Sequence, residues 1–138
     1  MGIEWVSRIP STVFTRIKNQ FSSTIKRKHK MEDSNFSAVG SRDAPAVFPF
    51  VYVKSLEPVE TGEDLEGTSI NGGLFTFQVD VYDNKYQANA KEVMMEVVRI
   101  MKRMGFKCKM LPSFDDSSKD VHRMTARFRR EIDDGDVL

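Results

Sequence analysis

The sequence predicts an α+β domain in which two helices pack on a four-stranded, mostly antiparallel sheet, in the order α-β-β-α-β-β. Three stretches carry this prediction. Residues 74–82 alternate between apolar and polar side chains, which is the period of a half-buried strand. Residues 90–104 place apolar side chains every three or four positions, on one face of a helix. Residues 121–132 alternate again. We expect a single domain over residues 1–138.

The first helix is expected over about residues 10–28. Pro10 suits a first helical turn, and the Ser and Thr that follow it can cap a helix. An apolar stripe then runs along one face, formed by Val13, Phe14, Ile17, Phe21 and Ile25. The helix ends in the basic cluster Lys26–Lys30, whose charges complement the helix dipole. A nucleic-acid contact remains the alternative role for this cluster.

Residues 31–45 are polar and turn-rich, so we expect a loop there that is a candidate for flexibility. The first strand follows at residues 46–56. Its apolar side chains fall on both faces, which indicates a sheet covered on both sides or a face that meets a partner. Pro49 has no N–H and favours an edge position or the beginning of the strand.

A long acidic connection, residues 57–73, joins the first strand to the second. Loops of this length are uncommon in compact domains and are often binding elements. Its carboxylates are candidates for a subunit or tube interface: Glu57, Glu60, Glu63, Asp64 and Glu66. They lack the ligand order of an EF-hand, so we predict no metal site.

The second half of the chain repeats the alternation between helix and strand. Gly105 is predicted as the residue in the left-handed conformation that ends the central helix. Phe106, Cys108 and Met110 then alternate as a third strand, in which Cys108 is expected to be a buried thiol and not a nucleophile. Residues 1–30 hold seven Lys and Arg against one acid, whereas residues 31–70 hold two against eight acids, and this segregation is compatible with head-to-tail self-association.

The last strand carries Arg123, Arg127 and Arg129 on one face, with Thr125 among them. Three uses of this arginine row stay open. It pairs with acids on an adjoining strand or helix, it receives the acidic loop or tail of a neighbouring subunit, or it contacts DNA phosphates without reading sequence. No catalytic motif accompanies it, and we predict a protein that is not an enzyme and has no cofactor. We also expect no membrane span and no secretory signal.

Four segments within roughly residues 46–132 are informative together: FPFVYVKSLEPVETGEDLEGTSIN, FTFQVDVYDNK, AKEVMMEVVRIMKRMGF and RMTARFRREI. They resemble the tail terminator (tail completion) proteins of long-tailed bacteriophages and prophages. The resemblance implies a structural protein that forms a homohexameric ring on the head-proximal end of the tail tube. Such a ring ends tube polymerisation and offers a docking surface to the head connector.

The same resemblance implies the partners and the location. The partners are further copies of the chain, the tail tube protein and the head–tail connector or stopper protein, with DNA passing through the lumen without sequence-specific binding. The location is the virion tail, after assembly in the cytoplasm of the host bacterium. The alternatives are a head–tail connector or stopper (neck) protein and a small nucleic-acid-binding protein.

Overall fold

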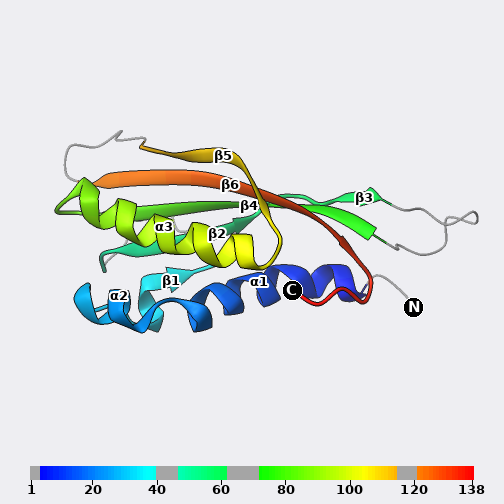
Figure 1. Cartoon of the computed structure of the whole chain (residues 1–138), viewed down its shortest axis with the longest axis horizontal. Helices are drawn as coiled ribbons and strands as arrows, with labels where there is room; N and C mark the ends of the chain where they lie inside the picture. Colours follow the sequence, from blue (N-terminus) through cyan, green and yellow to red (C-terminus); the bar gives the residue numbers. More distant parts are fainter. Residues whose placement is uncertain (1–3, 40–46, 62–71, 115–120) are drawn as a thin grey trace, which may run out of the picture.

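A computed structural model describes residues 4–39, 47–61, 72–114 and 121–138. These residues form three α-helices, one 3₁₀ turn and a six-stranded sheet (Figure 1). In chain order the elements are α1 (Glu4–Gln20), α2 (Ser23–Lys28), η1 (Asp33–Asn35), β1 (Phe36–Ser37), β2 (Phe50–Ser55), β3 (Val59–Thr61), β4 (Gly72–Asp83), α3 (Gln87–Arg103), β5 (Lys107–Phe114) and β6 (His122–Asp133).

The sheet has the strand order β1-β2-β4-β6-β5, and β3 pairs with β4 as well. Its centre is the antiparallel pair β4 and β6, which stay in register from Gly72 opposite Asp133 to Asp83 opposite His122. Strands β2, β3 and β5 also pair antiparallel with their neighbours. Only β1 runs parallel to its partner β2 among the described strands, so the sheet is mixed.

The prediction of a four-stranded sheet is therefore wrong, because two short strands were missed. β1 is two residues long and lies inside the expected loop 31–45, where so short a segment shows no alternation. β3 lies in the expected acidic connection. It continues along β4 where β2 ends, since β2 pairs with residues 77–82 and β3 with residues 72–74. Pro58, which has no N–H to donate to a ladder, lies between the two strands.

The prediction of two helices is also wrong, because the expected helix 10–28 is two helices and begins earlier. α1 starts at Glu4 and carries Pro10 in its interior. Pro10 has no N–H and cannot donate a hydrogen bond within the helix. The helix is nevertheless held against the sheet by four buried side chains spaced four residues apart: Trp5, Ile9, Val13 and Ile17. The chain then turns at Phe21 and Ser22 before α2 begins.

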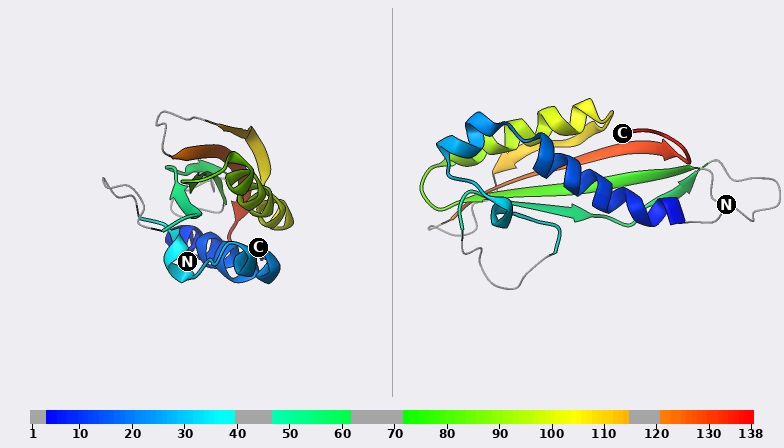
Figure 2. Two further views of the ribbon diagram at one scale, coloured as in Figure 1. Left: turned by 90° about the vertical axis from the view of Figure 1, so that its left-hand side faces the viewer. Right: turned by 90° about the horizontal axis from the view of Figure 1, so that it is seen from below.

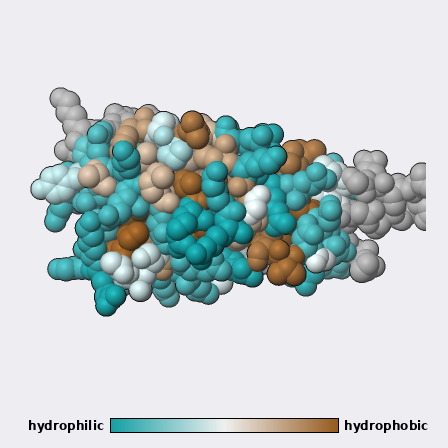
Figure 3. All heavy atoms as spheres, in the orientation of Figure 1, coloured by the Kyte–Doolittle hydropathy of each residue, from teal (hydrophilic) through white to brown (hydrophobic). Residues whose placement is uncertain are grey.

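Both long helices cover the same face of the sheet. Figure 2 shows α1 and α3 side by side beneath the strands, and the ring of Trp5 in α1 lies 6.0 Å from that of Phe75 in β4. The core between these layers contains the alternate residues of β4 and β6 that point toward the helices: Phe75, Phe77, Val79, Val81, Met124, Ala126, Phe128 and Ile132. The side of the molecule seen in Figure 3 is mostly hydrophilic, with scattered apolar residues.

The central helix agrees with its prediction. α3 buries one stripe of residues: Ala90, Val93, Met94, Glu96, Val97, Ile100 and Met101. Gly105 follows it with a φ of +86°, which confirms the predicted left-handed residue. The N–H groups of Gly105 and Phe106 donate to the carbonyls of Lys102 and Met101, both at 3.0 Å, and so close the end of the helix.

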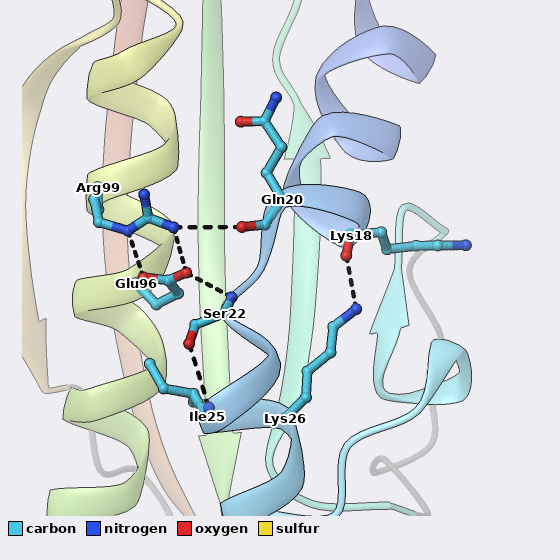
Figure 4. A network of polar contacts seen from close by, with 7 residues as sticks. All are labelled: Lys18, Gln20, Ser22, Ile25, Lys26, Glu96 and Arg99. Carbon is cyan, nitrogen blue, oxygen red and sulfur yellow. Dashed lines mark hydrogen bonds and ion pairs between the residues drawn. The ribbon is translucent and has the colours of Figure 1, made fainter.

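The turn between α1 and α2 is fixed to α3 by one buried carboxylate, Glu96 (Figure 4). Glu96 Oε2 accepts a hydrogen bond from the backbone N–H of Ser22 at 2.7 Å. Arg99 donates to both carboxylate oxygens, at 2.7 Å and 2.6 Å, and Arg99 Nη2 also donates to the carbonyl of Gln20 at 3.3 Å. Ser22 Oγ accepts from the N–H of Ile25 and caps α2. The end of one helix and the start of the next are thus held by a side chain of a third.

The first prediction concerns the buried face of α3. A Val97→Asp substitution puts a carboxylate among fully buried side chains without a partner, and we expect it to cost more than about 4 kcal/mol or to abolish folding. Met95→Asp is the matched control, since Met95 on the same helix is 51% exposed. Thermal unfolding followed by circular dichroism measures both variants. Equal melting temperatures would contradict the orientation of α3.

The second prediction concerns Glu96. Burial raises the pKa of this carboxyl, but the hydrogen bonds from Arg99 and Ser22 outweigh burial and leave the pKa below its usual value. The stabilisation is therefore present above the pKa of an unfolded Glu and is lost as the pH falls through the lowered value. We expect Glu96→Gln to reduce stability at pH 7 by about 2 kcal/mol and to flatten the loss of stability between pH 5 and pH 3. Urea unfolding across this pH range tests it, with the exposed Lys91→Ala as control.

Candidate interaction surface on the open face of the sheet

No described helix covers the face of the sheet opposite α1 and α3, and this face carries polar and charged side chains from four strands. The pairing of β4 with β6 places Thr76, Gln78, Asp80 and Tyr82 directly opposite Arg129, Arg127, Thr125 and Arg123. Lys54 on β2 pairs with Gln78, and Lys107 on β5 pairs with Arg129, so both lie on this face too. We call this set of side chains the open face.

A buried carboxylate, Asp80, organises the centre of the open face. Asp80 is only 3% exposed although no helix covers it. Thr125 Oγ1 donates to Asp80 Oδ1 at 2.7 Å, and Arg123 Nη2 donates to Oδ2 at 3.3 Å. Gln78 Nε2 donates to Oδ1 at 3.3 Å. A buried charge needs such partners, so Asp80 and the side chains around it hold one another in place.

Tyr82 continues this arrangement toward the end of β4. The guanidinium of Arg123 lies 6.0 Å from the centre of the Tyr82 ring, within the range of a cation–π contact. Burial, followed by the negative charge of Asp80, raises the pKa of the Tyr82 phenol. The ring of Phe50 on β2 lies 6.4 Å from that of Tyr82. This end of the open face is therefore aromatic as well as cationic, which agrees with the apolar residues predicted on both faces of the first strand.

The arginine row divides into two paired members and one unpaired member. Arg123 pairs with Asp80, and Arg127 Nε donates to Gln78 Oε1 at 3.0 Å. Arg129 is exposed, and its neighbours across the ladder are Thr76 and Lys107. Within the described residues Arg129 makes no ion pair, so pairing inside the chain accounts for Arg123 and leaves Arg129 available.

Two of the predicted acidic candidates, Glu57 and Glu60, lie away from the arginine row. Glu57 and Glu60 are exposed, Glu57 just before β3 and Glu60 within it. β3 and β6 pair with opposite sides of β4, and no ion pair joins these two glutamates to the row. Glu63, Asp64 and Glu66 lie outside the described residues. Within the described residues the fold thus brings Arg123 together with Asp80, and it does not bring the row together with Glu57 or Glu60.

Two residues of this surface were missed by reasoning from the sequence. Asp80 lies within the alternating residues 74–82, and an acid in the middle of such a strand is a signal for a cationic partner across the ladder. The position of Lys107 opposite Arg129 could not be predicted, because it depends on the register of β5 against β6, which has two irregularities. The partner of either residue is known only once the strands are paired.

The basic cluster Lys26–Lys30 is partly engaged within the chain. Lys26 Nζ donates to the carbonyl of Lys18 at 2.8 Å, and Lys28 Nζ pairs with Glu92 at 3.0 Å. The largely buried ring of His29 bonds to the same Glu92 at 2.6 Å. These hydrogen bonds lower the pKa of the Glu92 carboxyl. Lys28 and His29 of the cluster therefore attach the end of α2 to α3.

Other kinds of site have no support in the part of the chain that the structure describes. No group of three or more His, Cys, Asp or Glu side chains there is arranged to hold a metal ion. Burial raises the pKa of the Cys108 thiol, which makes it a poor nucleophile. No described helix has both the length and the apolar character that a membrane crossing requires. Comparisons with protein-family models and with curated proteins gave no match.

The third prediction distinguishes residues that stabilise the open face from residues that are exposed on it and free to contact a partner. Asp80→Ala leaves the guanidinium of Arg123 and the hydroxyl of Thr125 without their carboxylate, and we expect a loss of about 3 kcal/mol. Arg129→Ala removes an exposed side chain and should change stability by less than about 0.5 kcal/mol. Urea unfolding at pH 7 measures both. If the two variants are equally stable, Asp80 does not organise the open face.

Proposed function

We propose that the chain is a structural virion protein that forms a ring on the head-proximal end of the tail tube of a long-tailed phage. The ring ends tube polymerisation and offers a docking surface to the head connector. The resemblance of residues 46–132 to tail terminator proteins supports the proposal. The structural observation that carries it is the difference between the two faces of the sheet: α1 and α3 pack on one face, and among the described residues the other face displays a row of arginines.

A ring of identical copies requires two different surfaces on each copy that fit one another. The open face supplies a cationic surface, and the exposed Glu57 and Glu60 near β3 supply an acidic one. Opposite charges steer such surfaces together and favour one orientation over others. Arg123 and Arg127 are already held by Asp80 and Gln78, so they lose little conformational freedom when a partner binds.

Nucleic-acid binding is the second candidate, because the same face combines cations with aromatic rings. Arg127, Arg129 and Lys107 would contact a phosphate backbone without reading its sequence. A nucleic-acid-binding protein would bind DNA with an affinity that falls steeply with salt. A connector or stopper protein, in contrast, would sediment with DNA-filled heads and not with free tails.

The fourth prediction is a capping experiment with cognate tail tubes. The full chain should appear as a ring at one end of each tube in cryo-electron microscopy, and capped tubes should stop growing. An Arg127→Glu/Arg129→Glu variant should fold but cap at least tenfold less efficiently, because it reverses the exposed charges of the open face. Arg8→Glu/Lys91→Glu makes the same change in charge on the exposed sides of α1 and α3, and it should cap normally. Uncapped, growing tubes with the unaltered chain would refute the proposal.

A further inference from the structure

Two cations lie opposite each other near one edge of the sheet. Lys107 on β5 and Arg129 on β6 are directly opposed in the ladder, and both side chains are exposed. Like charges in directly opposed positions weaken a sheet unless something neutralises them. No acid among the described residues makes an ion pair with either side chain.

These cations line a shallow hollow of about 450 Å³ at the β5 edge. Lys109 adds a third cation, and Leu74, Gly105 and Glu131 form other parts of the wall. Glu131 is exposed and is not within ion-pair distance of the three cations. The neighbouring Arg130 is different, because it donates to the carbonyl of Met104 at 2.9 Å and lies 3.9 Å from Asp136. The hollow therefore gathers three cations, Lys107, Lys109 and Arg129, that make no ion pair within the described residues.

The acidic segment lies at the opposite edge of the same sheet. The strands follow one another as β3, β4, β6 and β5, so β3 and β5 are three strand spacings apart, which is roughly 14 Å. Glu60 is fixed in β3 opposite Gly73, and its side chain is too short to cross that distance. Glu57 and Glu60 therefore do not pair with Lys107 or Arg129 of the same chain.

We infer that the hollow at Lys107 and Arg129 receives the carboxylates of Glu57 and Glu60 from a second copy of the chain. This inference rests on the proposed ring. In that ring the β5 edge of one copy meets the β3 edge of the next. Acid at one edge and base at the other make the contact heterologous, so each copy uses its β3 edge toward one neighbour and its β5 edge toward the other. Leu74 gives the hollow an apolar side against which the methylene groups of the glutamates pack.

A charge-swap experiment on the full chain tests this pairing. The basic-edge variant is Lys107→Glu/Arg129→Glu, the acidic-edge variant is Glu57→Lys/Glu60→Lys, and a third variant combines all of these changes. Native mass spectrometry and analytical ultracentrifugation measure assembly, and circular dichroism verifies folding. We expect each double variant to need at least tenfold more protein for half-assembly. The combined variant should regain assembly, because its two edges are complementary again.

The outcomes separate the inference from the proposed function. Normal assembly of the folded basic-edge variant, or failure of the combined variant to recover, overturns the inference and leaves the ring in place. An unaltered chain that remains a monomer in isolation and on tail tubes overturns both. A labelled DNA duplex is the remaining probe. If the unaltered chain binds this duplex in a salt-dependent way, and the basic-edge variant loses this binding but still assembles, the hollow binds phosphate. This result also overturns the inference.

Discussion

The register between β4 and β6 is the constraint on which the rest of the molecule depends. Side chains alternate along a strand, so a slip of one residue would move every core residue of β6 to the other face of the sheet. The observed register puts Phe128 beside Phe77 and Ala126 beside Val79, under the helices. It equally puts Thr125 beside Asp80 and Arg127 beside Gln78 on the open face. The apolar core and the polar surface are thus two results of a single alignment.

The elements with a strong period of their own could be predicted from the sequence. Phe75, Phe77, Val79 and Val81 show the alternation of β4, and the spacing of Val93, Val97 and Met101 shows the buried stripe of α3. Gly105 marks the end of that helix because few other residues adopt its backbone conformation. The exposed arginine row on β6 was also predicted, since it needs only the alternation of that strand. Each of these inferences uses information contained in one short segment.

The parts that escaped prediction depend on contacts between distant segments. β1 exists only because Phe36 and Ser37 lie beside β2, and its two residues have no pattern of their own. The division of the first helix depends on Glu96, which binds the N–H of Ser22 from 74 residues away in the chain. Asp80 and Lys107 gain their importance from the residues across the ladder, Thr125 and Arg129. Local periodicity cannot report any of these partners.

The edge strand β5 has a consequence for the size of the ring proposed above. Its pairing with β6 shifts between Cys108 and Met110 and again between Met110 and Ser113, and Pro112 has no N–H to offer. An incoming strand would find no continuous ladder there, which protects the sheet against the unlimited stacking of amyloid. Association at this edge has to proceed through side chains, which can set a fixed angle between neighbours. A repeated fixed angle that adds up to a full turn gives an object of finite size.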